Sequence, residues 1–139
     1  MAEFQVVVIG AGPGGYLTAI KLSQLGQKVA LIENDKLGGE CLNYGCIPSK
    51  TMINTSDMYH KMPDLSTQGI EFESVTVDLE TFQTWKNSIT KKLRGGIDLL
   101  CKNYGVEVVF GTAKIRNPNL VEVTSGENKK EISTEYIII

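Results

Sequence analysis

The first third of the chain alternates between short apolar runs and mixed segments, with glycines between them. Residues 4–9 are mostly apolar and β-branched, which is typical of a buried strand. Residues 16–25 keep the amphipathic spacing of a helix, and residues 28–32 form a second apolar run. This order of strand, tight turn, helix and strand predicts a parallel Rossmann-like α/β sheet. We expect residues 4–9 at its centre and residues 28–32 beside them.

The middle of the chain predicts one long helix. Residues 79–104 carry apolar side chains at helical spacing and end before Gly105, a residue that commonly caps helices. The apolar positions are Leu79, Phe82, Trp85, Ile89, Leu93, Ile97 and Leu100. Residues 58–74 show an irregular pattern with a proline and a glycine, so we expect a connection there.

Short strands follow the long helix. Four apolar segments are separated by turn residues, at 106–110, 113–115, 120–123 and 131–139. We expect residues 113–134 to form a small antiparallel β-meander added to the parallel sheet. The chain has 139 residues without a repeat or a low-complexity segment, which fits a single domain over residues 1–139.

A glycine-rich turn follows the first predicted strand. Gly10, Gly12 and Gly15 form a G-x-G-x-x-G pattern, in which the glycines permit the turn, the approach of a pyrophosphate and close packing of the helix. Glu33 ends the second strand about twenty residues later, where a carboxylate can accept hydrogen bonds from ribose hydroxyls. Its charge would repel a 2′-phosphate. We therefore expect a dinucleotide site rather than an ordinary turn, although this motif alone does not distinguish FAD from NAD.

Two cysteines lie within residues 39–50, GECLNYGCIPSK. In an ideal helix the rise between Cys41 and Cys46 would exceed the limit of about 7 Å between the Cα atoms of a disulfide, so we expect a backbone break. Gly45 and Pro48 favour a helix that begins near Cys46, whose amides would lower the pKa of the Cys46 thiol. Such a dithiol points to redox chemistry.

Two other interpretations of this pair have less support. A structural disulfide is unusual in a chain with three cysteines and no secretory signal. A zinc site would need further ligands, and only Cys101 and His60 remain, so we expect no metal site. We expect Cys101 to be a small packing residue within the long helix and His60 to face solvent.

Charge and hydropathy exclude two classes of partner. The net charge is −2 with both signs interspersed, so the chain has no basic stripe for nucleic acid. Its apolar runs are much shorter than the roughly 20 residues of a membrane span. We expect neither nucleic acid nor membrane as a partner, and we find no room for a signal or transit peptide.

Residues 38–50, GGECLNYGCIPSK, resemble the active-site segment of the dihydrolipoamide dehydrogenases, within the FAD-dependent pyridine nucleotide-disulfide oxidoreductases. Glutathione and mercuric reductases usually carry Val where this chain has Leu42 and Ile47. Glutathione reductases often carry Lys where it has Ser49. These differences favour the lipoamide enzymes, and the resemblance runs along the whole chain.

The resemblance implies a role for each residue of this segment. Cys41 would be the interchange thiol that meets the substrate, Cys46 would face the flavin, and Lys50 would lie beside the flavin ring, where a cation favours negative charge on the reduced flavin. Residues 111–113 match the segment whose backbone would contact the adenine. A simple bend between strands would need the same residues, so this alternative has more support here than at the glycine turn. The expected FAD contacts are Gly10, Gly12, Gly14, Gly15, Glu33, Asn34, Gly38, Gly39, Glu40, Cys41, Lys50, Gly111, Thr112 and Ala113.

The implied activity is that of a dihydrolipoyl dehydrogenase. Such an enzyme reoxidises protein-bound dihydrolipoamide and passes electrons through a Cys41–Cys46 disulfide and FAD to NAD. Its partner would be a lipoyl-bearing acyltransferase or lipoyl protein of a 2-oxoacid dehydrogenase or glycine cleavage system. The alternatives are a glutathione- or mercuric-reductase-like enzyme of the same family, or a non-catalytic nucleotide-binding module.

The end of the chain is typical of a truncated protein. Residues 136–139 form a strand without a cap or polar tail. The resemblance implies nicotinamide-binding, central and dimer-interface domains beyond it, which would hold the NAD site, the homodimer contact and the catalytic histidine. We therefore do not assign that role to His60, and we expect the fragment alone to be inactive. The expected location is the cytoplasm, or the mitochondrial matrix for a processed eukaryotic form.

Overall fold

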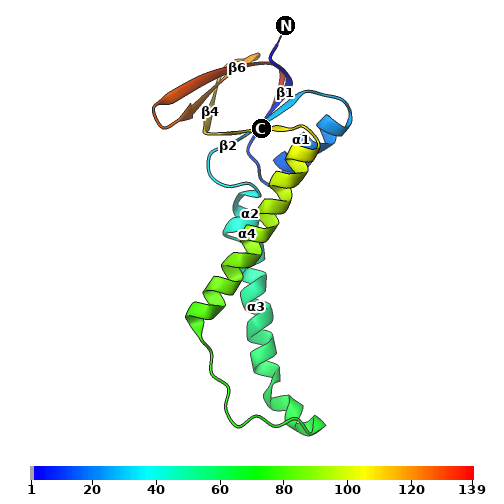
Figure 1. Ribbon diagram of the computed structural model, residues 1–139, viewed down its shortest axis with the longest axis vertical. Coiled ribbons are helices and arrows are strands. Elements are labelled where there is room, and N and C mark those ends of the chain that lie inside the picture. The colour runs from blue at the N-terminus through cyan, green and yellow to red at the C-terminus, as the bar shows by residue number, and fades with distance from the viewer. Residues whose placement is uncertain (1) are drawn as a thin grey trace.

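The computed structural model describes residues 2–139 as one six-stranded mixed sheet with helices (Figure 1). The strand order is β3-β2-β1-β6-β5-β4. The strands are β1 Phe4–Ile9, β2 Val29–Glu33, β3 Glu107–Phe110, β4 Thr112–Asn117, β5 Leu120–Ser125 and β6 Asn128–Ile138, and the helices are α1 Pro13–Gln24, α2 Gly39–Asn43, α3 Cys46–Lys61, η1 Pro63–Gln68 and α4 Leu79–Asn103. The α/β fold class is confirmed.

The sheet has a parallel part and an antiparallel part that share strand β6. β1 pairs in parallel with β2 on one side and with β6 on the other, so it is central as predicted. The first half of β6 pairs with β5, from Asn128 to Ser133, and β5 pairs with β4. From Thr134 onward β6 pairs with β1 instead. One strand therefore joins the Rossmann sheet to the predicted meander.

The core lies on both faces of the parallel strands. Val6 and Val8 of β1 contact buried residues of α1 and α4 on one face. Val7 and Phe4 contact Val121 and other meander residues on the opposite face. A strand covered on both faces can carry a continuous apolar run, which is why residues 4–9 lack strict alternation.

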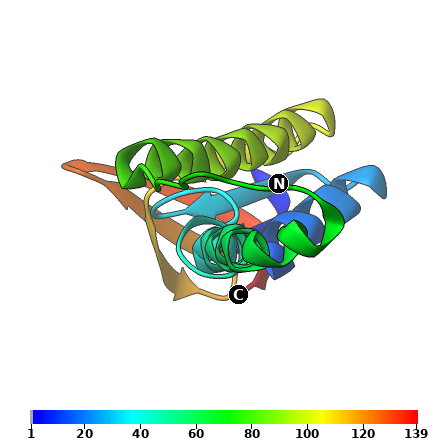
Figure 2. The same ribbon diagram turned by 90° about the horizontal axis from the view of Figure 1, so that it is seen from below.

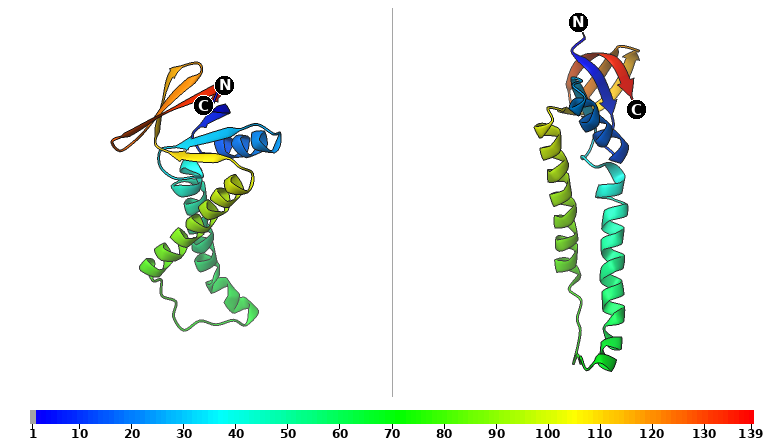
Figure 3. Two further views of the ribbon diagram at one scale, coloured as in Figure 1. Left: turned by 45° about the horizontal axis from the view of Figure 1, so that its top comes forward. Right: turned by 90° about the vertical axis from the view of Figure 1, so that its right-hand side faces the viewer.

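Helices α3 and α4 form a long hairpin that projects from the sheet (Figure 1, Figure 3). Figure 2 shows the hairpin from below, with α3 nearly end-on and the sheet behind it. The helix predicted at 79–104 is confirmed as α4, and Asp78 caps it by accepting hydrogen bonds from the amides of Glu80 and Thr81. None of the helices within residues 2–139 is long and apolar enough to span a membrane.

Two helix boundaries differ from the prediction by three residues or more. α1 begins at Pro13, three residues earlier than expected, because Pro is well suited to the first turn of a helix and Gly15 packs against the preceding strand. α3 continues to Lys61, so the first residues of the expected connection are helical. The irregular pattern begins only at Pro63, where the short 3-10 helix η1 follows.

The apolar stripe of α4 is mostly exposed in this chain. Ile97 and Cys101 are buried over the sheet, whereas Leu79 and Trp85 are 68% and 48% exposed. The first half of α4 runs along the hairpin, away from the sheet (Figure 1). Periodicity thus predicted the helix correctly but did not predict which part of its apolar face is covered.

Candidate redox and dinucleotide site

The glycine turn lies at the carboxyl edge of β1, where ligands bind in open parallel sheets. Gly10 has a φ of +96°, and its amide donates to the carbonyl of Ile32 at 2.8 Å. A Cβ on Gly15 would lie 1.8 Å from the carbonyl oxygen of Gly10. Any larger residue would push the helix off the turn, so the structure confirms the close packing expected at Gly15.

Glu33 joins the end of β2 to this turn. Its side chain is buried, with the residue 7% exposed. One carboxylate oxygen accepts from the amide of Ala11 at 2.7 Å, and the other accepts from the amide of Asp35 at 2.8 Å. Each oxygen keeps a lone pair, so Glu33 can still accept from the hydroxyls of a ribose placed at the sheet edge.

The loop before α2 folds back onto the glycine turn. The amide of Gly38 donates to the carbonyl of Ala11 at 2.8 Å, and a Cβ on Gly39 would lie 2.7 Å from the Cα of Gly12. Apart from the neighbouring residues of the same turn or helix, no described atom lies within 4 Å of the place where a Cβ on Gly10, Gly12 or Gly14 would stand. The first turn of α1 therefore has an open side of bare backbone, which fits the pyrophosphate of a dinucleotide.

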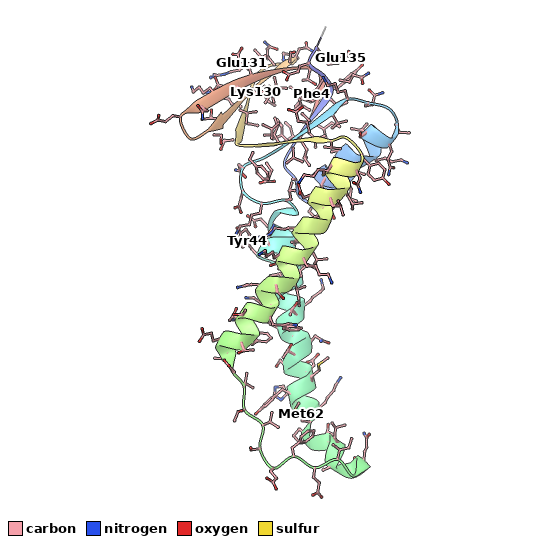
Figure 4. All side chains as sticks on the ribbon, viewed as in Figure 1. Phe4, Tyr44, Met62, Lys130, Glu131 and Glu135 are labelled. Carbon is pink, nitrogen blue, oxygen red and sulfur yellow. A yellow bond between two sulfur atoms is a disulfide. The ribbon has the colours of Figure 1, made fainter. Side chains whose placement is uncertain are left out.

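Cys41 and Cys46 lie on two separate helices and form a disulfide. α2 ends at Asn43 and α3 begins at Cys46, and the chain turns sharply at Tyr44 and Gly45. The Cα atoms are 4.7 Å apart, which confirms the predicted break, because a continuous helix would separate them by more than 7 Å. Figure 4 labels Tyr44 at this turn, at the end of α3 opposite to Met62.

The two cysteines have different surroundings. Cys46 is the first residue of the 16-residue helix α3, so its sulfur lies at the amide-rich, partially positive end. Cys41 lies inside the five-residue helix α2. Lys50 follows Cys46 by one turn of α3 and is exposed. Both cysteines are half-buried, so a substrate can reach the pair.

The segment at 111–113 lies beside Glu33 at the edge of the sheet. The amide of Gly111 donates to the carbonyl of Glu33 at 2.8 Å, and Thr112 and Ala113 begin β4. A Cβ on Gly111 would lie 2.7 Å from the carbonyl oxygen of Thr124. The bend between β3 and β4 therefore needs a glycine for steric reasons alone, and the adenine contact stays a prediction.

The remaining expected contacts also lie along this edge. Asn34 is exposed directly after β2, and Glu40 is exposed in the first turn of α2. The fold thus places most of the predicted cofactor residues on the loops and helix starts that follow the parallel strands, whereas Lys50 lies one turn into α3 and Thr112 and Ala113 lie in β4. Their contact with FAD stays a prediction.

Sequence reasoning missed the contacts that fix α2. The side-chain amide of Asn43 donates to the carbonyls of Leu37 and Gly39 at 3.0 and 2.8 Å. Nη1 of Arg94, on α4, donates to Oδ1 of Asn43 at 3.0 Å. An asparagine between the two cysteines could have signalled a local cap. Nothing in the sequence around Arg94 signalled its partner, 51 positions away.

The other candidate metal ligands lie away from the disulfide in the fold. Cys101 is buried in α4, and burial, assisted by the negative charge of Asp98, raises the pKa of its thiol. His60 is exposed near the end of α3. The expected packing role of Cys101 and exposed position of His60 are both confirmed.

Comparison with known proteins agrees with this geometry. The family model described as "Pyridine nucleotide-disulphide oxidoreductase" matches residues 4–139. The chain is 44% identical over 137 residues to a dihydrolipoyl dehydrogenase of Geobacillus stearothermophilus and 47% identical over 137 residues to that of Bacillus subtilis; each match covers 99% of this chain. The mitochondrial dihydrolipoyl dehydrogenase of Sus scrofa is 46% identical over 141 residues.

A solved structure has the same fold. The HOCl-induced flavoprotein disulfide reductase RclA of Escherichia coli matches with a TM-score of 0.77 and 28% identity, over 96% of this chain and 27% of that one. The chain spans 29% of the length of the two bacterial dihydrolipoyl dehydrogenases. With the family model matched over nearly all residues, this chain belongs to the pyridine nucleotide-disulphide oxidoreductase family.

Proposed function

We propose that this chain forms the FAD-binding, disulfide-bearing part of a dihydrolipoyl dehydrogenase, with NAD as the final electron acceptor. The observation that carries the proposal is the Cys41–Cys46 disulfide at the start of α3. It directly follows the loop that folds over the glycine turn through Gly38 and Gly39. A reducible sulfur pair and a dinucleotide cradle thus share one edge of the sheet.

The substrate step follows from the difference between the two cysteines. A thiolate of the dihydrolipoyl group attacks the sulfur of Cys41, forms a mixed disulfide and breaks the Cys41–Cys46 bond. Cys46 leaves as a thiolate, which the start of α3 stabilises, and a better-stabilised thiolate leaves faster. The second lipoyl thiol then displaces Cys41. The lipoyl group has lost two electrons and two protons. The electrons are now on the enzyme pair, one proton is on the Cys41 thiol, and the other has passed to solvent.

The residues that would hold FAD are those of the sheet edge. The open backbone at Gly12 and Gly14 would receive the pyrophosphate, and Glu33 would accept from the ribose. Lys50, one turn beyond Cys46, would lie beside the flavin ring. Bound FAD would supply the two-electron step between the enzyme dithiol and NAD. The carboxylate of Glu33 disfavours a 2′-phosphate at this site.

The proposed partner is a lipoyl-bearing acyltransferase or lipoyl protein of a 2-oxoacid dehydrogenase or glycine cleavage system. The proposed assembly is a homodimer, in the cytoplasm or in the mitochondrial matrix. The support for this is the similarity to dihydrolipoyl dehydrogenases rather than any contact within the described residues.

Differential alkylation of the full-length protein tests the roles of the two cysteines. The protein is reduced with dihydrolipoamide and treated with iodoacetamide, and the labelled peptides are quantified by mass spectrometry. We expect Cys41 to be labelled several-fold faster than Cys46, and Cys41→Ser and Cys46→Ser each to abolish dihydrolipoamide-dependent NAD reduction. Cys101→Ala serves as the control and should retain activity.

Two results would count against the proposal. Faster labelling of Cys46 than of Cys41 would reverse the assigned roles. Turnover of glutathione disulfide with NADPH, but not of dihydrolipoamide with NAD, would favour the glutathione-reductase alternative.

A further inference from the structure

We propose that Arg94 is a positioning residue that holds the redox turn in the geometry needed for the Cys41–Cys46 disulfide. This inference rests on the proposed function only in that the pair must cycle between disulfide and dithiol. It concerns a residue on α4, outside the cysteine segment.

The first step of the argument is that α2 needs external support. It has five residues, and an isolated helix of that length is unstable in water. Its side-chain anchors are Leu42, which is buried in the core, and Asn43. The amide of Asn43 donates to the carbonyls of Leu37 and Gly39, so this side chain ties the last residue of α2 to its beginning.

The second step is that Arg94 fixes Asn43 from outside. Its guanidinium donates to Oδ1 of Asn43 at 3.0 Å in a partly buried position. With this bond, Nδ2 of Asn43 donates two hydrogen bonds and Oδ1 accepts one. These three bonds together fix the orientation of the side-chain amide. Both residues line a cavity of about 510 Å³ between α2, α3 and α4, and none of the residues that line it carries a carboxylate.

The third step connects this bond to the sulfurs. α4 packs against both α2, which carries Cys41, and α3, which carries Cys46. Arg94 therefore ties the Cys41 helix to the same element that supports the Cys46 helix. Fixing the two helices relative to each other raises the effective concentration of one sulfur at the other, and the disulfide is stabilised relative to the dithiol.

The test measures the redox equilibrium of the pair rather than turnover. The full-length protein is equilibrated with mixtures of reduced and oxidised dithiothreitol. The oxidised fraction of the peptide with Cys41 and Cys46 is then read by mass spectrometry. We expect Arg94→Met to lower the equilibrium constant for disulfide formation about three- to tenfold; a tenfold change corresponds to about 30 mV. Arg94→Lys, which keeps a cationic donor, should recover part of this loss.

Two further variants separate positioning from a general loss of stability. Lys92→Met removes an exposed cation from the same helix and should behave as wild type. Asn43→Ala should lower the equilibrium constant at least as much as Arg94→Met, because it also removes the bonds to Leu37 and Gly39, and the double variant should be no worse than Asn43→Ala alone, because Arg94 acts through Asn43. Near-UV circular dichroism checks that each variant is folded.

The outcomes distinguish this inference from the proposed function. If the wild-type pair is not reduced and reoxidised reversibly, the proposed function fails and the inference fails with it. If the wild-type pair cycles but Arg94→Met matches it within twofold, the inference alone is wrong. Additive effects of Arg94→Met and Asn43→Ala would also overturn it.

Discussion

At the scale of single residues, Glu33 has the most defined environment of the predicted site. Its place at the end of a strand, about twenty residues after the glycine turn, could be predicted from spacing alone. Its hydrogen bonds to the amides of Ala11 and Asp35 could not be predicted, since they depend on how the loop after β2 folds. Glu33 therefore binds two backbone amides of the surrounding loops, and its contact with a ribose stays a prediction.

Substitution of Glu33 tests both roles. We expect Glu33→Ala to weaken FAD retention at least tenfold, because a hydrogen bond to a charged group is worth about 1.5–3 kcal/mol and tenfold corresponds to about 1.4 kcal/mol. Glu33→Gln keeps one acceptor oxygen and should lose less. Flavin content after serial dilution and ultrafiltration measures the effect, and Glu127→Ala, in an exposed turn, is the control. Unchanged retention in Glu33→Ala would contradict the ribose assignment.

At the scale of elements, helix α4 shows what a periodic pattern can and cannot predict. The spacing of its apolar residues and Gly105 predicted both ends of the helix within one residue. The pattern identifies an apolar face but does not show which residues pack against it. Trp85 and Leu93 of that face are exposed here. The pattern also failed to predict the start of α1. Gly14 and Gly15 have low helix propensity, but the packing of Gly15 on Gly10 keeps them helical.

The N-terminal cap of α4 should make the stability of the helix depend on pH. The hydroxyl of Thr81, followed by its amide, binds the Asp78 carboxylate and holds its pKa below the usual value. A carboxylate whose pKa is lower in the folded state stabilises that state above its unfolded pKa of about 3.9, and this contribution is lost as the pH falls through the folded pKa.

We therefore expect the stability difference between wild type and Asp78→Ala to be constant near neutral pH and to shrink below about pH 4. Asp78→Ser keeps a capping oxygen but has no titrating group. It should be more stable than Asp78→Ala, and the stability difference between these two variants should not depend on pH. Thermal unfolding followed by far-UV circular dichroism from pH 2 to pH 7 measures this. A difference that stays the same at pH 2.5 and pH 7 would be evidence against the cap.

At the scale of the whole molecule, the sheet separates two cores, which lie on opposite faces of β1 and β2. The strands, the central place of β1 beside β2 and the meander were predicted from apolar runs and turn residues, because these signals are local, whereas the positions of β3 and β6 in the sheet were not predicted. The tie between Arg94 and Asn43 could not be predicted, because it joins segments 51 positions apart by polar side chains that carry no periodic signal. The break in the helix between Cys41 and Cys46 could be predicted, because the Cα atoms of a disulfide lie closer together than a continuous helix allows.

Ile132 tests the contribution of the meander core to the whole sheet. It is fully buried in β6 against the meander side of the sheet. We expect Ile132→Ala to lower the free energy of unfolding by about 2–5 kcal/mol, through lost apolar burial and the cavity that remains. Ile115→Ala, at an exposed position of β4, should change it by less than about 0.5 kcal/mol. Equal effects of the two in urea unfolding would show that the meander core adds nothing to the stability.

The pairing of β1 with β6 has a consequence for synthesis on the ribosome. Phe4 pairs with Thr134, so β1 waits for a partner strand that is translated 130 positions later. At roughly 5–20 residues per second, this delay is roughly 6–26 s. During that time one edge of β1, with Val6, Val7 and Val8, stays unpaired on the nascent chain. That edge is a natural target for chaperones that bind extended apolar segments during translation.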